Sequence, residues 1–291
     1  MELLLQLTIE ALLLGSFYAF MSVGFSLTWG VLNIINLSYG TLIIIGSYLA
    51  YFLYVNLGID PLISMPLNAL VGFGAGVLLQ KLFINRVMNY EPFMVLILTF
   101  GLDILLSHTL NIIFSADIRS IDVSYAEGSF LLGAFIFSQV KLIVFFLALT
   151  LVAFLFIFLR LSWTGKSIRA VALDREGALL VGIDPKRVFL IASGIGTAVA
   201  FSSGSMYGLL QGFTPFDGGF LTVKAFLVSI VGGLGRVEGA LLGGLFLGFL
   251  EIFVSFYAGE SWKLFASLVV MVLFLLLRPR GLLGGKYYGE T

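Results

Sequence analysis

The chain has 291 residues, of which 60% are hydrophobic and only 11% are charged, and its 16 basic residues balance its 16 acidic ones. Soluble domains carry about 25% charged residues, so this chain has too few polar side chains to cover a water-exposed surface. The balanced charge gives no reason to expect nucleic-acid binding. Cysteine is absent, which excludes disulfides and thiolate chemistry. With a mean hydropathy of +1.10, the composition predicts an integral membrane protein.

Apolar runs of about 20 residues, the length that crosses a bilayer as a helix, recur along the whole chain. They cover residues 3–28, 38–57, 62–83, 92–114, 139–160, 187–210 and 237–257. A shorter run covers 262–278, and another, 219–235, is interrupted by three glycines, Gly232, Gly233 and Gly235. We therefore expect an all-α polytopic membrane bundle of about eight or nine transmembrane helices, with broken or re-entrant segments, forming one transmembrane domain over residues 1–291.

Basic residues mark the cytoplasmic side of a membrane protein. They gather in residues 160–187, in residues 84–91 together with the nearby Lys81, and in the C-terminal tail. The connector 115–129 instead carries three acidic residues against Arg119 alone. The three basic segments are therefore expected in the cytoplasm, and 115–129 and the N-terminus outside, which agrees with about nine crossings.

Two interruptions rich in Gly and Asn, residues 30–40 and 218–239, occur one in each half of the chain. Paired interruptions in the two halves of a transporter often mark the binding region between internal repeats. Two tight connections between spans explain them equally well, and no strong sequence repeat is visible.

The run 92–114 has a polar stripe, formed by Thr99, Asp103, Ser107 and Asn111 at every fourth residue. A carboxylate at mid-bilayer costs about 2.5–3.5 kcal/mol on insertion scales, so Asp103 is expected to face a partner or a wet cavity. The stripe is either pore-lining or a hydrogen-bonded packing seam.

A second deep carboxylate, Glu251, lies on the run 237–257. Four glycines at GxxxG spacings precede it: Gly239, Gly243, Gly244 and Gly248. This spacing favours close helix packing, with Glu251 bonded to a neighbouring helix, although a substrate role is an alternative. Lys224, near the outer end of the broken segment, is expected to snorkel to the interface or to pair with Asp103 or Glu251.

No catalytic residue and no metal site are expected. Residues 164–167 (Thr-Gly-Lys-Ser) end like a phosphate-binding P-loop, but Arg160 stands where its first glycine must be. His108 is the only histidine, which excludes a multi-histidine metal site. The chain is therefore not expected to be an enzyme or to hold a cofactor.

Residues 161–186, between two apolar runs, are predicted to form a short amphipathic helix that ends in a turn. Its apolar side is expected from Ile168, Ala172 and Leu179, and Gly182 suits a C-cap before Pro185. Its solvated side is expected from four residues: Arg169, Asp174, Arg175 and Glu176. Such a segment docks into a groove on a soluble partner or rests on lipid headgroups.

This connector resembles the coupling loop of the permease subunits of branched-chain amino acid ABC importers. The matching residues are Gly165, Arg169, Ala170, Asp174, Ala178, Gly182 and Ile183, continuing through Arg187 and Val188. Residues 30–36 (Gly-Val-Leu-Asn-Ile-Ile-Asn), the glycine-rich stretch 224–251 and residues 277–282 (Leu-Arg-Pro-Arg-Gly-Leu) are similar to three further motifs of that family. Where the family commonly has Phe-Ala-His-Gly-Glu, residues 37–41 are Leu-Ser-Tyr-Gly-Thr, without the two ionisable groups. The substrate is therefore expected to be leucine, isoleucine, valine or a similar small amino acid, with the urea or amide permeases of the same family as an alternative.

The resemblance implies a permease domain in the plasma (inner) membrane of a prokaryote, with its translocation path expected at six residues: Asn33, Asn36, Thr99, Asp103, Ser107 and Lys224. It implies a second permease subunit, expected to be a non-identical relative, and two cytoplasmic ATPase subunits bound at residues 161–186. It also implies an extracytoplasmic substrate-binding protein. An ion-coupled secondary transporter, with Asp103, Glu251 or Lys224 as its relay, is the alternative from another class.

Overall fold

The computed structural model describes the chain except residues 1, 89, 126–127, 133–134, 279–280 and 284–291. In the described part, eight helices are long and apolar enough to cross a membrane. They are α1 (Glu2–Leu32), α2 (Tyr39–Leu57), α3 (Pro61–Leu79) continued by the π-helical turn η1 (Gln80–Ile84) and α4 (Asn85–Val87), α5 (Pro92–Phe114), α6 (Gln139–Leu161), α9 (Pro185–Leu210), α11 (Val237–Ala258), and α12 (Lys263–Leu277) with the 3₁₀ turn η2 (Glu260–Trp262) before it. The shorter elements are the hairpin of β1 (Ser129–Leu132) and β2 (Phe135–Ser138), α7 (Trp163–Leu173), α8 (Arg175–Leu180) and α10 (Gly218–Gly232).

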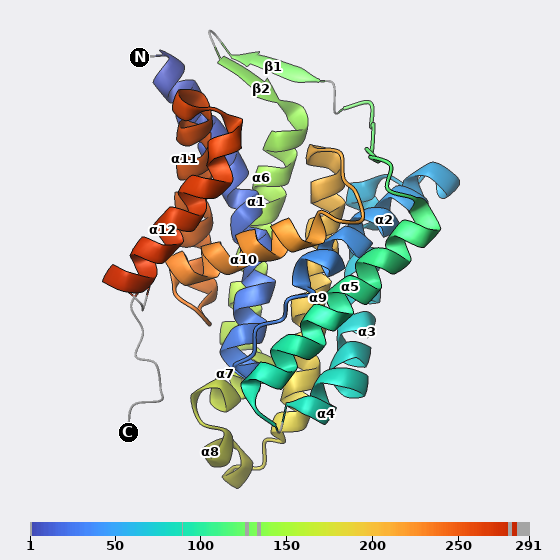
Figure 1. Cartoon of the computed structure of the whole chain (residues 1–291), viewed down its shortest axis with the longest axis vertical. Helices are drawn as coiled ribbons and strands as arrows, with labels where there is room; N and C mark the ends of the chain where they lie inside the picture. Colours follow the sequence, from blue (N-terminus) through green and yellow to red (C-terminus); the bar gives the residue numbers. More distant parts are fainter. Residues whose placement is uncertain (1, 89, 126–127, 133–134, 279–280, 284–291) are drawn as a thin grey trace.

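The predicted all-α bundle is confirmed, and the broken segment 219–235 forms a half-span. It becomes α10, whose 15 residues extend about 22 Å, less than the roughly 30 Å thickness of a hydrocarbon core. In Figure 1 α10 lies obliquely across the bundle at mid-height, whereas its long neighbours run from end to end. The described part of the chain therefore holds eight helices long and apolar enough to cross a membrane and one apolar helix, α10, that is too short to do so.

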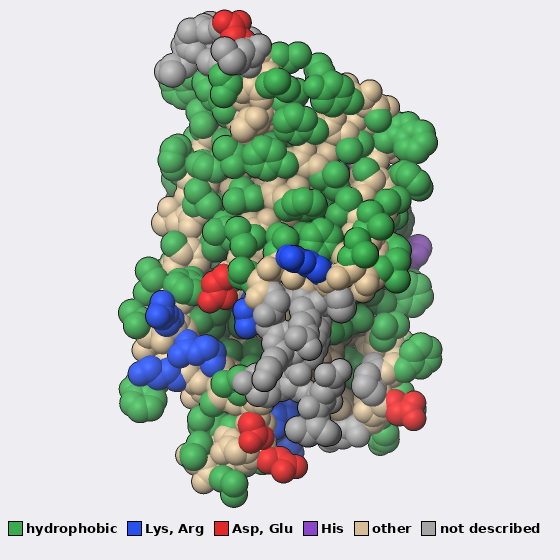
Figure 2. All heavy atoms as spheres, turned by 90° about the vertical axis from the view of Figure 1, so that its left-hand side faces the viewer, with side chains coloured by type: hydrophobic (Ala, Val, Ile, Leu, Met, Phe, Trp, Pro, Cys, Tyr) green, Lys and Arg blue, Asp and Glu red, His purple; other side chains and the backbone are tan. Residues whose placement is uncertain are grey.

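The two ends of the bundle carry different connectors (Figure 1). The start of α1 and the β1–β2 hairpin lie at one end, here called the hairpin end, and α4, α7 and α8 lie at the other, here called the α8 end. The basic connectors 84–91 and 160–187 thus share the α8 end, as expected. Figure 2 shows a face that is mostly hydrophobic in its upper half, with its basic side chains at or below mid-height. Residues 284–291, the C-terminal part of the orientation argument, lie outside the described residues.

The hairpin was not among the expected elements. Its strands pair antiparallel, with Ser129 opposite Ser138, and follow the connector that begins after α5. Both strands are short and rich in Phe, Leu and Ile, which favour a strand where there are too few residues for a helix.

Glycines let α11 lie directly against α1. A Cβ atom on Gly248 would lie 2.6 Å from the Cα of Gly15, and one on Gly244 would lie 2.5 Å from the Cα of Ala19. Gly239 and Gly243, on another side of α11, lie as close to the backbone of α10. These four glycines, singled out by their spacing, thus lie where α11 touches two helices, an arrangement typical of small residues in membrane bundles.

Candidate functional site

The two glycine-rich interruptions lie against each other in the structure. α1 ends at Leu32, residues 33–38 are not helical, and α2 starts again at Tyr39. A Cβ atom on Gly30 would lie 2.7 Å from the Cα of Gly235. A Cβ atom on Gly40 would collide with the carbonyl oxygen of Gly218, and one on Gly218 would lie 2.8 Å from the Cα of Thr41. The start of the first interruption therefore lies beside the later part of the second, and the end of the first lies beside the start of the second. This antiparallel pairing brings the two interruptions, one from each half of the chain, into one region of the bundle.

Side chains from two other helices bind the exposed backbone of the first interruption. The hydroxyl of Thr99, on α5, donates to Ile35 O and accepts from Leu37 N, both at 3.2 Å. The hydroxyl of Thr222, on α10, accepts from Gly40 N at 2.7 Å and lies 3.0 Å from Leu37 O. Non-helical backbone at membrane depth is tolerated only where protein or a water-filled cavity supplies its hydrogen bonds, and here α5 and α10 supply them.

Asn36 and Ser38 complete the interruption from within. The Asn36 carboxamide oxygen accepts from the Ser38 backbone N–H at 3.1 Å and from the Ser38 hydroxyl at 2.7 Å. Both residues are buried. Asn36, predicted on the path, therefore shapes the backbone just before α2.

Asp103 lies one helical turn beyond Thr99 on α5 and is half-buried. The Thr41 hydroxyl, at the start of α2, donates to its carboxylate. Ser107, another turn along, is buried and donates to the Asp103 carbonyl oxygen at 2.8 Å. Within the described residues Asp103 forms no ion pair. The structure thus gathers Asn36, Thr99 and Asp103 around the first interruption, whereas Ser107 bonds only carbonyl oxygens of its own helix.

α5, the helix that carries this stripe, is among the least enclosed spans. In its most apolar stretch of 18 residues only 28% of the residues are buried, compared with 78% in the corresponding stretch of α9. Large apolar side chains such as Ile97, Phe100 and Ile104 are exposed on it. One face of the Asp103 region is therefore open toward whatever lies beside α5.

Asn33 lies apart from this group. It stands just beyond the C-terminal end of α1, at the α8 end of the bundle, with an exposed side chain and a left-handed backbone (φ 58°). Asn is one of the few residues other than Gly that adopt this conformation readily. Asn33 therefore accounts for the end of α1, and its position does not favour a place on a mid-membrane path.

Lys224 belongs to a second, separate cluster and does not snorkel to the interface. Its Nζ lies 2.8 Å from Glu251 Oε2, and the two side chains are only 7% and 1% exposed. The Tyr18 hydroxyl, on α1, donates to the same carboxylate oxygen at 2.7 Å and accepts a hydrogen bond from Lys224. The Lys224 ammonium also lies over the Tyr18 and Phe220 rings, 4.6 and 4.5 Å from their centroids.

This cluster ties the half-span to its neighbours. Lys224 is on α10, Glu251 on α11 and Tyr18 on α1, and the Ser267 hydroxyl, on α12, lies 3.3 Å from the other Glu251 oxygen. A cavity of about 470 Å³, lined also by Glu10 and Gln211, borders the pair. Desolvation of two charges is compensated only by good geometry and additional hydrogen bonds, and Tyr18 and Ser267 provide these.

The connector 161–186 forms two helices instead of one. Ser162 caps α7 by accepting from Gly165 N at 2.9 Å, and Asp174 ends α7 and caps α8 by accepting from Glu176 N at 3.0 Å. Gly182 has φ +84°, and Ile183 N donates to Ala178 O at 2.9 Å. The glycine therefore ends the helical segment as predicted, one residue beyond the cap position.

Two arginines predicted to be solvated bind the bundle instead. The Arg169 guanidinium donates to Leu159 O and, at 3.2 Å, to Arg160 O, two carbonyls at the end of α6. The Arg175 guanidinium donates to Leu32 O at 2.8 Å and lies 5.1 Å from the centroid of the Phe189 ring. Both side chains are exposed in part, but their charged ends hold α7 and α8 to the last carbonyls of α6 and α1, where cations are favoured.

The apolar surface of the connector also differs from the prediction. Ile168 is buried against the bundle, together with Val171 and Ala178, whereas Ala172 and Leu179 are exposed. Leu179, Leu180 and Val181 form an apolar tip with exposed fractions of 58%, 89% and 74%. The three residues predicted to form the apolar side are therefore divided: Ile168 packs against the bundle, whereas Ala172 of α7 and Leu179 of α8 stay exposed. Ala178 and Gly165, matched to the family's loop, are buried, whereas Ala170 and Asp174 are partly or fully exposed.

Three residues that the sequence did not single out complete these sites: Thr222, Thr41 and Tyr18. Thr222 lies two residues before Lys224 in the broken segment, so a hydroxyl in a half-span was an available signal. Thr41 stands at the position where the family commonly has Glu. Tyr18 carried no signal, because a tyrosine in an apolar helix most often packs in the core.

A bundle with non-helical backbone buried at mid-depth, beside an unpaired carboxylate, has the architecture of a membrane transporter. Residues 7–276 match the family model described as branched-chain amino acid transport system / permease component, and the chain belongs to this family. It is 30% identical to the high-affinity branched-chain amino acid transport system permease protein BraD of Pseudomonas aeruginosa, over 96% of this chain and 95% of the relative. It is 28% identical to the corresponding protein LivH of Escherichia coli (96% and 95% covered) and 27% identical to a probable LivH of Methanocaldococcus jannaschii (94% and 90% covered). No solved structure gives a significant match.

The Lys224–Glu251 pair generates a prediction about stability. Lys224→Met and Glu251→Gln should each destabilise the protein by about 3–5 kcal/mol, because each leaves one buried partner uncompensated. The double variant Lys224→Met/Glu251→Gln should lose much less than the sum of the single changes. Unfolding midpoints of the four proteins in detergent measure this coupling, and additive losses would show that the two charges do not depend on each other.

Proposed function

We propose that the chain is the path-forming permease subunit of an ATP-driven importer of branched-chain amino acids. Family membership over nearly the whole chain makes it a transport subunit. The observation that carries the location of the path is the buried non-helical segment 33–38 beside Asp103, held by Thr99 of α5 and Thr222 of α10. In broken-helix transporters, substrate sites lie at such points.

The path in this proposal runs along the open face of α5. A second permease subunit covers that face, so that Asp103 looks into the space between the subunits. The half-buried carboxylate suits the ammonium group of an amino acid, and the exposed Ile97, Phe100 and Ile104 suit an apolar side chain. An ionised carboxylate at this depth has to meet water or a cation.

The ATPase subunits in this proposal bind the apolar tip of α8. Leu180 and Val181 are 89% and 74% exposed, and α8 lies at the lower extremity of the bundle in Figure 1. Apolar side chains on a short amphipathic helix are the usual anchors for a groove on a partner. This places the α8 end, with its basic connectors, in the cytoplasm of a prokaryotic cell, and the hairpin end toward an extracytoplasmic binding protein.

Force from the ATPase reaches the path through Arg175 in this proposal. Its guanidinium binds Leu32 O, the last residue of α1 before the interruption at 33–38. A displacement of α8 therefore pulls on the start of the non-helical segment. The other end of that segment leads into α2, where Gly40 bonds Thr222 and Thr41 bonds the Asp103 carboxylate. Arg169 fixes α7 to α6 in the same way.

Asp103→Asn should lower uptake at least tenfold, because loss of one charged hydrogen bond costs about 1.5–3 kcal/mol. Uptake of labelled leucine by proteoliposomes holding the complete transporter measures the effect. Asp117→Asn, which removes a charge from a carboxylate whose side chain is 74% exposed, serves as the matched control. Normal uptake by both Asp103→Asn and Asp103→Leu would exclude Asp103 from the path.

Leu180→Asp should abolish association with the ATPase subunits, because it puts a charge on the most exposed residue of the apolar tip. Co-purification of the ATPase with the tagged permease measures it. Ile118→Asp introduces the same charge at a residue that is 75% exposed in the connector after α5 and should leave association unchanged. Equal recovery of ATPase with Leu180→Asp would move the docking surface elsewhere.

Arg175→Gln should separate ATP hydrolysis from uptake. The ATPase stays bound and active, because the apolar tip is intact, but transport falls because the bond to Leu32 O is lost. Lys186→Gln removes the same charge from an exposed side chain on the same connector and should transport normally. Unchanged uptake per ATP hydrolysed in Arg175→Gln would contradict this route of force.

A further inference from the structure

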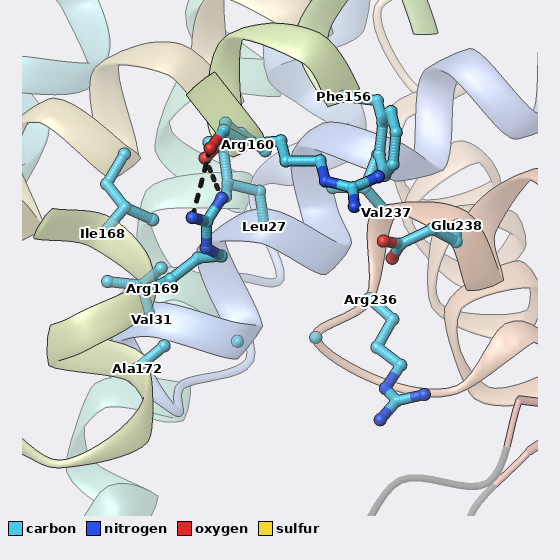
Figure 3. Close-up of a pocket in the computed structure, with 13 residues that line it drawn as sticks. Leu27, Val31, Phe156, Arg160, Ile168, Arg169, Ala172, Arg236, Val237 and Glu238 are labelled. Atoms are coloured by element: carbon cyan, nitrogen blue, oxygen red, sulfur yellow. Dashed lines mark hydrogen bonds between the residues drawn. The ribbon is translucent and has the colours of Figure 1, made fainter. Parts of the chain in front are cut away.

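A cavity of about 630 Å³ lies near the α8 end, between α1, α6, α7 and the turn before α11. Figure 3 shows Arg160 and Arg236 on one side with Glu238 between them, and Arg169 across the cavity from them. Three guanidinium groups and one carboxylate give this cavity a net charge of +2. Neither the proposed path nor the ATPase docking surface uses Arg160, Arg236 or Glu238.

The charged groups of the cavity have few partners of their own. Arg236 donates to Leu283 O at 3.1 Å, and the Arg160 guanidinium lies 5.9 Å from the centroid of the Phe156 ring. Within the described residues none of these arginines forms an ion pair, and neither does Glu238. No hydrogen bond or ion pair of the Arg160 guanidinium is found within the described residues, so its donors are available to an anion from outside the chain.

An apolar groove continues from this cavity along the bundle. It has a volume of about 540 Å³ and shares Phe156, Val237 and Glu238 with the cavity. Its other walls are apolar residues of α6 and α11 and one beyond α12: Leu149, Val152, Ala153, Leu241, Leu242 and Leu283. Because α6 and α11 both cross the membrane, the groove faces the acyl chains of the bilayer. The cavity, at the ends of the same helices, lies at the level of the headgroups.

We propose that the cavity and the groove together bind one anionic phospholipid whose headgroup carries hydroxyl groups. Its phosphate binds Arg160 and Arg236, since guanidinium groups match phosphate oxygens in bidentate geometry. Its headgroup hydroxyls donate to Glu238, which otherwise repels an anion. One acyl chain occupies the groove between α6 and α11. Basic pockets between transmembrane helices on the cytoplasmic side are known to hold anionic headgroups.

The place of this site gives the lipid a structural effect. Gly30 and Gly235, where the two interruptions touch, also line the cavity, and so do Arg169 and Ile168 of α7. A bound lipid therefore braces α6 against the turn that precedes α11, beside the helix that receives force from the ATPase.

Phosphatidylglycerol, phosphatidylcholine and free glycerol phosphate, added to the purified full-length chain in detergent, test the proposal. Thermal stabilisation and native mass spectrometry give the affinities. Phosphatidylglycerol should bind saturably and more tightly than phosphatidylcholine. Arg160→Gln/Arg236→Gln should weaken it roughly thirtyfold, whereas the control Lys166→Gln/Lys186→Gln, which removes the same charge from residues that do not line the cavity, should not.

Ala153→Phe fills the groove without changing any charge and tests the acyl-chain half of the site. It should weaken phosphatidylglycerol binding and leave the melting temperature without lipid unchanged. Three results would overturn the proposal: equal affinity for both lipids, equal losses in the arginine variant and its lysine control, or stabilisation by glycerol phosphate alone that Ala153→Phe does not affect. The last would mean that the arginines bind a free phosphate and no lipid.

Discussion

The backbone of residues 33–38 has to find hydrogen-bond partners inside the protein, because the surrounding medium offers none. Much of the site follows from this requirement. Thr99 brings α5 to the interruption, and Thr222 brings the start of α10. The same two hydroxyls that satisfy the backbone also set the positions of Asp103, one turn from Thr99, and of Lys224, two residues from Thr222. The break between α1 and α2 thus fixes the positions of two other helices, α5 and α10.

The half-span α10 meets a second requirement. Its 15 residues cannot anchor themselves by spanning the bilayer, so the Lys224–Glu251–Tyr18 cluster and the glycine contacts with α11 hold it. The ion pair is buried where a broken one would be very costly. The half-span is therefore held strongly at its middle while its two ends contact the interruption. Such contacts suit a helix that keeps its position while the non-helical segment beside it changes conformation.

The sequence predicts the places where the chain leaves its helices better than it predicts what those places contact. Gly and Asn content identified both interruptions, and Gly182 identified the end of α8. Lys224 was harder, because an apolar half-span gives no sign that Glu251, 27 residues further on, returns beside it. Arg169 and Arg175 looked solvated because their partners are backbone carbonyls of α6 and α1, and backbone acceptors leave no trace in residue types. Tyr18 became identifiable only when helices distant in sequence were placed side by side.

The sparse packing of α5 has a consequence for assembly. A lone copy of the chain presents the open side of α5 to lipid, with the half-buried Asp103 carboxylate close to the acyl chains, and this arrangement carries an insertion penalty that packing against another helix removes. In the proposed complex, association with a second subunit is then favoured by relief of that penalty, in addition to the packing energy of the interface itself.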